Sequence, residues 1–305
     1  MILYMLRRLL EAVPVLLAVI TIAFFLVRLA PGGPFDTDKR ADPRVLARLE
    51  AHYRLDQPLF RQYLDYLGGV VRGDLGPSYR KPGRTVTEWM LLRFPVSLEL
   101  GLYALAVAVF FGLAAGVLAA HRPNSMVDHG AMSLAMLGIC LPNFVLGPLL
   151  VLVFSLWLGW LPVAGWSTPA HKILPTLTLG AMYAAYIARL ARGGMLEVMA
   201  QDYIRTARAK GLSEARVVLR HGLRGGLQPV VAFLGPAAAG LFTGSFVVET
   251  VFQIPGLGRE FVESAFNRDY TMVIGAVLVF AVLVVLLNLA ADLALAVLDP
   301  RVRER

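Results

Sequence analysis

Long apolar runs separated by polar segments form the main pattern along this chain. A helix rises about 1.5 Å per residue, so about 20 apolar residues cross a hydrocarbon core of roughly 30 Å. Six runs are long enough, and they lie at about residues 9–30, 97–120, 131–158, 173–192, 228–249 and 272–297. The pattern therefore predicts an all-α, polytopic membrane protein with six transmembrane helices.

The first apolar run follows Arg7 and Arg8, as the apolar core of a secretory signal would. The run extends from Leu9 to Ala30, which is too long for such a core, and no small-x-small cleavage site follows it. We therefore expect a retained first span.

Residues 31–96 form the longest segment between two runs. Within it, residues 42–71 place apolar side chains near helical spacing, interrupted by Leu55-Asp56-Gln57-Pro58. This spacing predicts two short amphipathic helices, and the glycines and proline of residues 73–77 predict a turn.

Composition supports a membrane location. Hydrophobic residues make up 57% of the 305 residues and charged residues 16%, and the mean hydropathy is +0.65. So much apolar surface implies a lipid environment. The only cysteine is Cys140, so an internal disulfide is impossible.

The formal net charge of +8 bears on orientation. The 189–224 loop carries eight basic residues against three acidic ones, whereas the 250–271 loop carries only Arg259 and Arg268. Because short basic loops stay in the cytoplasm, we expect the 189–224 loop and both termini there, the C-terminal tail adding Arg301, Arg303 and Arg305. The 31–96 segment is also basic, but long loops cross largely regardless of charge, so we expect it outside.

These expectations divide the chain into three parts. Residues 1–30 form a cytoplasmic tip and the first span, residues 31–96 form the extracytoplasmic segment, and residues 97–305 form a five-span core. The core contains a cytoplasmic loop at 193–226.

Enzyme motifs are missing from the sequence. It contains no G-x-x-x-x-G-K-[ST] phosphate loop, no G-x-S-x-G and no H-E-x-x-H. The five histidines are scattered over loops, without the spacing of metal ligands in a helix. We therefore expect a non-catalytic chain without a metal or a cofactor of its own.

The segment 197–213 carries the most information about function. Asp202 is expected to cap a helix with Tyr203, Ala207 and Lys210 on one face, and Gly211 is expected to end it, because glycine adopts the left-handed conformation easily. Ser213 can cap the next helix. A short helix parallel to the membrane surface would fit a groove of another protein. A solvated basic loop is equally compatible with these residues.

Polar residues inside the spans are candidates for a pathway or for helix packing. Asn288 and Asp292 lie four residues apart on the last span, so both are expected to face protein or water. Glu249 lies near a span end, as Glu99 does, where its side chain can reach the interface.

A set of ordered motifs resembles one known family, the inner-membrane permease subunits of binding-protein-dependent ATP-binding-cassette (ABC) importers. The segment Tyr203–Ser213 is similar to that family's cytoplasmic signature in its oligopeptide/dipeptide form, and the chain is closest to oligopeptide permease B type subunits. Further matching motifs are residues 29–35, 53–58, 73–79, 94–97, 248–252, 255–258, 267–270 and 299–301. The Gly-Pro-Ser-Tyr sequence at 76–79 and the Pro-Gly-Gly-Pro-Phe sequence at 31–35 resemble the B type of oligopeptide permease more than the dipeptide or nickel types.

One part of the signature departs from the broad family pattern. Arg205 and Thr206 stand where the family has Glu and Ala, with Ala207 at the second Ala. His221 and Arg224 stand at the later Ile and Pro positions. The peptide branch shares this divergence, so a docking role is still implied, without the glutamate.

The resemblance implies a type I ABC importer permease fold in the bacterial inner membrane, moving oligopeptides into the cytoplasm. It implies a second permease subunit, two ATPase subunits that hold ATP and Mg, and an extracytoplasmic binding protein. The residues implied to dock an ATPase, as a coupling helix, are Asp202, Tyr203, Ile204, Arg205, Thr206, Ala207, Arg208, Ala209, Lys210, Gly211, Leu212 and Ser213.

Several alternatives stay open from the sequence. Within the same class, the solute could be a dipeptide, glutathione, a nickel chelate or a peptide antibiotic. A stand-alone secondary transporter or channel would require an inverted repeat and paired broken helices, and neither is visible in the sequence.

Overall fold

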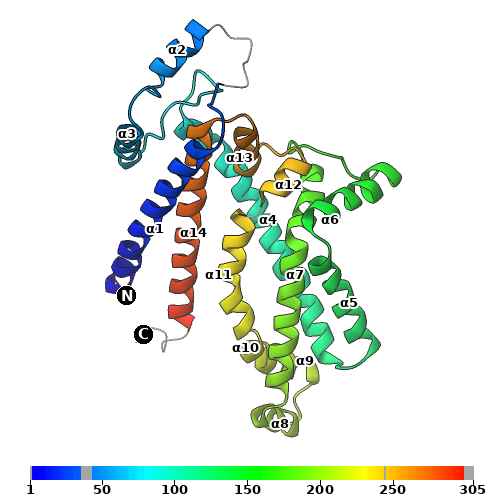
Figure 1. The fold of residues 1–305 in the computed structure, drawn as a ribbon. Coiled ribbons are helices and arrows are strands. Elements are labelled where there is room, and N and C mark those ends of the chain that lie inside the picture. The colour runs from blue at the N-terminus through cyan, green and yellow to red at the C-terminus, as the bar shows by residue number, and fades with distance from the viewer. Residues whose placement is uncertain (1, 36–42, 244, 299–305) are drawn as a thin grey trace. The chain divides into compact units, whose positions relative to one another are not determined.

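Helices make up nearly all of the structure, a computed structural model that describes residues 2–35, 43–243 and 245–298 (Figure 1). Contacts within the chain divide it into two compact units. Residues 1–97 and 255–285 form the first unit, and residues 98–254 with 286–305 form the second. The matching motif at 299–301 and the C-terminal tail arginines lie outside the described residues.

The first unit combines the N-terminal part of the chain with a segment from its last third. Its helices are α1 (Ile2–Leu29), α2 (Pro43–His52), α3 (Leu59–Val71), the start of α4 (Val86–His121), α13 (Leu257–Phe266) and most of α14 (Tyr270–Leu298). Helices α2 and α3 confirm the two amphipathic helices predicted from the sequence. The core of this unit consists of Ile20, Leu75, Val86, Met90, Leu257, Met272, Ala276 and Leu278.

The second unit contains the remaining helices. They are α5 (Met126–Cys140), α6 (Asn143–Leu150), the π-helix η1 (Val151–Trp157), α7 (Pro169–Met199), α8 (Asp202–Ala209), α9 (Glu214–Arg216), the π-helix η2 (Val217–Gly222), α10 (Leu223–Gly226), α11 (Gln228–Thr243) and α12 (Phe246–Val251).

Five helical segments of the described residues are long and apolar enough to cross a membrane. They are Leu10–Leu29, Val86–His121, Pro169–Met199, Gln228–Val251 and Tyr270–Ala290. A sixth span results if the bent pair Met126–Cys140 and Asn143–Trp157 counts as one. These five or six spans among the described residues confirm the prediction of a six-span helical bundle.

The predicted third span, 131–158, was wrong as a single straight helix. Its two halves meet at an angle of 111° between Cys140 and Asn143. Pro142 causes the break, because proline donates no backbone N–H and pushes the preceding residue out of the helical conformation. Leu141 accordingly has an extended backbone, with φ −96° and ψ 114°.

Helix α4 begins eleven residues before the predicted span. Thr85 and Glu88 exchange hydrogen bonds of 3.1 and 3.2 Å between side chains and backbone N–H groups, which is a capping box. This reciprocal cap fixes the start of α4 at Val86.

Glycines of α4 allow it to approach α7 closely. A Cβ atom at Gly112 would lie 2.7 Å from the Ala184 carbonyl oxygen, and one at Gly116 would overlap the backbone at Ala188. Glycine at these two positions therefore lets the backbones of α4 and α7 pack directly together.

Candidate functional site

Helix α8 follows the end of α7 after only two residues and lies far from α6 and α12 within its unit (Figure 1). Its N-cap is Gln201, so the prediction that Asp202 caps the helix was wrong. Asp202 instead occupies the first turn, where a carboxylate favours the helix dipole, and accepts a hydrogen bond of 3.2 Å from Arg205.

The end of α8 follows the sequence prediction more closely. Gly211 has a φ of +76°, in the left-handed region, and directly follows the C-cap residue Lys210. Ser213 occupies the N-cap position of α9, but its side chain makes no capping hydrogen bond.

The inner face of α8 packs on its own chain. Ile204 and Ala207 are buried with Val217, and Val198, Met199 and Leu212 pack around them. The prediction that Ala207 shares an outer face with Tyr203 and Lys210 was therefore wrong. Ile204 and Ala207 are the apolar pair at helical spacing, so together they form the side that seals against η2.

The outer face of α8 is available for another molecule. It is polar and exposed, and it carries Asp202, Tyr203, Arg205, Thr206, Arg208, Ala209 and Lys210. Such a surface is solvated in the isolated chain and offers charges, two hydroxyl groups and one small residue to a partner.

An ion pair closes the turn after α8. Arg208 donates two hydrogen bonds to the Glu214 carboxylate, from Nε at 3.1 Å and from a terminal nitrogen at 2.7 Å. These bonds lower the pKa of Glu214 and raise that of Arg208. The bidentate geometry fixes α8 relative to α9 across the Gly211 turn.

Glycines and methionines join the segment after α8 to the end of α7. A side chain at Gly194 would overlap the carbonyl group of Gly226, and one at Gly222 would lie 3.1 Å from the Met199 sulfur. At Gly194 there is no space for a Cβ, so α7 and α10 are in direct backbone contact there, whereas Gly222 packs against methionine side chains of α7.

A second ion pair joins α7 to α5, farther from α8 than the glycine contacts. Arg192 donates to both oxygens of the Asp128 carboxylate, at 2.6 and 2.7 Å, and thereby joins α7 to the first turn of α5. Asp128 is buried and also accepts from the Asn124 N–H at 2.9 Å. Sequence patterns did not predict this pair, since the only signal was one acid and one base within largely apolar helices.

Of the three candidate pathway residues, the structure describes the side chains of Glu249 and Asn288. The prediction that the Glu249 side chain reaches an interface was wrong, because Glu249 is fully buried and accepts a hydrogen bond of 2.7 Å from Ser245. Asn288 is exposed on α14. The side chain of Asp292 lies outside the described residues.

Glu99, expected near a span end, belongs to a small polar cluster. It accepts hydrogen bonds from Trp166 Nε1 and Tyr103 at 3.0 Å each and pairs with Lys172. The carboxylate therefore has three donors, one of which is the Lys172 cation, and this explains its position on an apolar helix.

Several of the matching sequence motifs meet in the first unit around Asp269. This buried carboxylate accepts from Ser78 Oγ, and from the backbone N–H groups of Tyr79 at 3.1 Å and Arg80 at 3.3 Å. Arg80 also donates to the Pro34 carbonyl at 2.6 Å. Burial raises the pKa of Tyr79 to about 12, so its hydroxyl stays neutral. Motifs at 29–35, 73–79 and 267–270 therefore form one structural junction.

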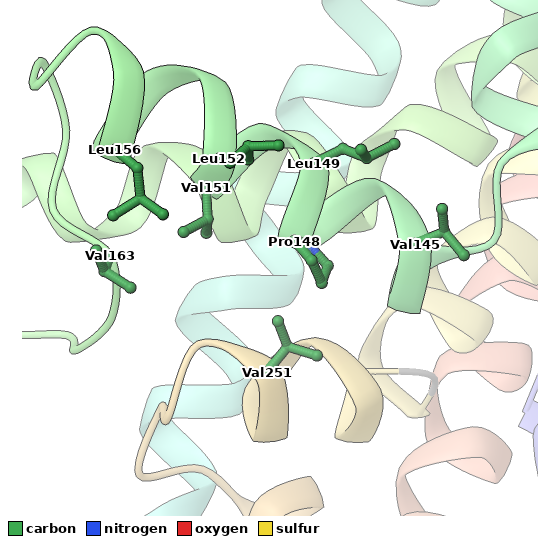
Figure 2. Close-up of a pocket in the computed structure, with 8 residues that line it drawn as sticks. All are labelled: Val145, Pro148, Leu149, Val151, Leu152, Leu156, Val163 and Val251. Atoms are coloured by element: carbon green, nitrogen blue, oxygen red, sulfur yellow. The ribbon is translucent and has the colours of Figure 1, made fainter.

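An apolar pocket of about 590 Å³ lies beside the second arm of the bent pair. Figure 2 shows its walls, which come from α6, η1, the loop at Val163, and Val251 of α12. All eight lining residues are apolar, so their side chains offer no partner for the charged ends of a peptide.

Comparison with known families covers almost the whole chain. A family profile described as a binding-protein-dependent transport system inner membrane component matches residues 112–304. The N-terminal profile for membrane components of the same transport systems matches residues 1–101.

Similar proteins have been characterised as transporter subunits. The oligopeptide transport system permease protein OppB of Haemophilus influenzae is 46% identical, over 98% of this chain and 99% of its own length. The dipeptide transport system permease protein DppB of Bacillus subtilis is 44% identical, over 98% and 97%. The glutathione transport system permease protein GsiC of Escherichia coli is 42% identical, over 98% of both.

Solved structures show the same fold at much lower identity. A methionine ABC transporter, MetNI, in inward-facing conformations matches with a TM-score of 0.54 and 18% identity, over 69% of this chain and 96% of its own. An amino acid ABC transporter matches with a TM-score of 0.53 and 17% identity, over 70% and 94%. The chain therefore belongs to the family of multi-pass inner membrane components of binding-protein-dependent transport systems.

Proposed function

We propose that this chain is a translocating subunit of an ABC importer for oligopeptides and that α8 receives the force of the ATPase. The names of the most similar relatives support a peptide substrate, and they include an oligopeptide, a dipeptide and a glutathione transporter. A dipeptide, glutathione, a nickel chelate or a peptide antibiotic remain alternatives within the same class.

The two-sided character of α8 carries this proposal. Its inner face is locked to η2 and α7 through Ile204 and Ala207, while its outer face is polar and exposed. A helix bound on one side and open on the other can transmit a push from a partner. A solvated loop without these contacts would absorb the same push by bending.

The contacts around α8 suggest how movement would spread through the unit. Helix α7 has 31 residues, so it extends about 46 Å at the helical rise per residue. A displacement of α8 would move the end of α7 directly, and the Asp128–Arg192 pair would carry α5 with it. Alternating access requires a partner that contacts α8 differently in two states, because only differential contacts shift an equilibrium.

The proposed machine has further subunits. A second, related permease would pair with this chain, two ATPase subunits would bind ATP and Mg, and an extracytoplasmic binding protein would deliver the solute. This chain would perform no hydrolysis itself, and its residues would position the partners and form part of the pathway.

The proposed orientation places α8 and both termini in the cytoplasm. Basic residues support it, because Arg205, Arg208, Lys210, Arg216 and Arg220 lie on or directly after α8. The 31–96 segment would then face the other side of the membrane.

A tryptophan on the outer face of α8 tests the docking role. Ala209→Trp adds bulk at an exposed position, so we expect the protein to reach the membrane in normal amount while peptide uptake and peptide-stimulated ATPase activity are lost. The matched control is Ala51→Trp, at an exposed alanine of α2, which should retain uptake. Normal uptake by Ala209→Trp would contradict the docking role.

A second experiment separates this function from that of a stand-alone transporter. The purified chain in liposomes should not move labelled peptide until the partner subunits and ATP are added. Peptide movement by the chain alone would contradict the proposal.

A further inference from the structure

Helix α3 lies at the depth of the first membrane span. Its Tyr63 hydroxyl is 2.7 Å from Thr21 Oγ1, and its ring lies 5.3 Å from that of Phe24. Both Thr21 and Phe24 belong to the Leu10–Leu29 span. Thr21 is eight residues before Leu29, which places it about 12 Å inside that end of the span. A helix that touches Thr21 therefore cannot lie wholly outside the membrane.

The rotation of α3 about its own axis follows from its contacts. Gln62 accepts a hydrogen bond of 3.2 Å from Arg28, near the end of the span, whereas the adjacent Tyr63 contacts Thr21, about 10 Å deeper. Gln62 also donates to the carbonyl groups of Leu55 and Gln57, at 3.0 and 2.8 Å. The Gln62 side of α3 is thus its outer side, covered by the preceding loop.

The opposite side of α3 carries an exposed apolar stripe. Phe60, Leu64 and Val71 are 66%, 49% and 87% exposed, and they lie at helical spacing on one face. A rotation of about 160° separates this stripe from Gln62, at 100° per residue. The stripe therefore points away from the loop and further into the membrane.

A polar stripe borders the apolar one. Arg61 and Asp65 are exposed, four residues apart, and lie about 100° around the helix from Phe60 and Leu64. Adjacent apolar and charged faces of this kind are typical of helices that lie in the plane of a membrane interface.

The geometry points to a bilayer-embedded helix: α3 lies in the leaflet at the Leu29 end of α1, with Phe60, Leu64 and Val71 among the acyl chains and Arg61 and Asp65 among the headgroups. The apolar stripe of α3 is therefore covered by lipid. Helix α1 itself exposes the apolar side chains of Ile22 and Leu26 at this level. This inference does not depend on the transported solute or on the role of α8.

Spin labels provide a direct test in the assembled transporter in lipid nanodiscs. In a Cys140→Ser background, which removes the exposed native thiol, one label is placed at a time by Phe60→Cys, Leu64→Cys or Val71→Cys. The matched controls are Arg61→Cys and Asp65→Cys on the neighbouring face. Collisions with molecular oxygen report acyl chains, and collisions with a water-soluble nickel chelate report water.

The expected result is a reversal between the two faces. Labels on the apolar stripe should collide with oxygen and be protected from nickel, whereas labels at Arg61 and Asp65 should collide with nickel. Nickel access to the stripe would mean that it faces water, and protection from both reagents would mean that protein covers it. Nickel protection at Arg61 and Asp65 would mean a different rotation of the helix. Each of these three results would overturn the proposal.

Discussion

At the residue scale, two arginine–carboxylate pairs hold the elements around α8. The Asp128–Arg192 pair is the more enclosed one, with the Asp128 side chain 2% exposed and that of Arg192 29% exposed. Arg208 and Glu214 are 43% and 44% exposed. Burial decides the consequence of mutation. Removing one partner of a buried pair leaves an uncompensated charge, whereas water solvates the charge that remains when one partner of an exposed pair is removed.

The enclosed pair should therefore couple strongly. Asp128→Asn and Arg192→Gln are each expected to lower the midpoint of thermal unfolding in detergent by several degrees, and the double variant should lose less than the sum. Intrinsic tryptophan fluorescence measures these midpoints. Fully additive effects would show that the two side chains stabilise the protein independently.

The exposed pair should respond to acid. The hydrogen bonds from Arg208 lower the pKa of Glu214 in the folded protein. The stabilising effect of the pair is therefore complete above the pKa of Glu214 in the unfolded chain, about 4.3, and it is lost as the pH falls through the lower pKa of the folded protein. The effect is at most about 1 kcal/mol, because solvent screens exposed pairs.

A spin label at Thr206 can follow this change, since its mobility reports how firmly α8 is held. Mobility should increase on acidification below pH ~4, given the unfolded reference value. In the Glu214→Gln variant, the label at Thr206 should already be mobile at neutral pH, and its mobility should change little in acid. An identical acid response in both proteins would exclude the pair as the cause.

At the element scale, helix length and type could be predicted better than helix direction. The lengths of the apolar runs predicted the spans, and Gly211 predicted the end of α8. The run 131–158 contains no charged residue, so its length did not distinguish one straight helix from two arms. Pro142 marked the break, but proline also occurs within α7 and α11, where the helix continues.

The faces of α8 show a related limit. The sequence placed Ala207 on a small-residue outer face because Tyr203, Ala207 and Lys210 share helical spacing. Which face turns inward depends on Val217, which lies in a π-helix that no sequence pattern predicts. Residues distant in sequence, such as Asp128 and Arg192, were likewise beyond the reach of local patterns.

Close packing of α4 on α7 leads to a prediction with a matched control. Gly116→Ala should destabilise the protein, because its Cβ would overlap the backbone of Ala188. Gly130→Ala in α5 should be neutral or stabilising by up to about 1 kcal/mol, since nothing lies within 4 Å and alanine favours helix more than glycine does. Thermal unfolding in detergent compares the two, and equal midpoints would contradict the close contact.

At the scale of the whole molecule, orientation is the property most open to a direct test. In a Cys140→Ser background, Ala51→Cys on α2 and Lys210→Cys after α8 both place a thiol at an exposed position. An impermeant thiol reagent should label Ala51→Cys in intact cells, after outer-membrane permeabilisation where there is one. It should label Lys210→Cys only after lysis, because the proposed orientation puts α8 inside. The reverse pattern would invert the topology.

The junction at Asp269 has a consequence for how the protein is made. Ser78 and Asp269 are 191 residues apart in sequence, yet the first unit needs both to satisfy its buried polar groups. At a synthesis rate of about 5–20 residues per second, the ribosome needs about 10–40 s to reach Asp269 after Ser78. During that interval the loop that carries Ser78 lacks its partner Asp269. Insertion chaperones and membrane proteases have this window in which to recognise an unfinished chain.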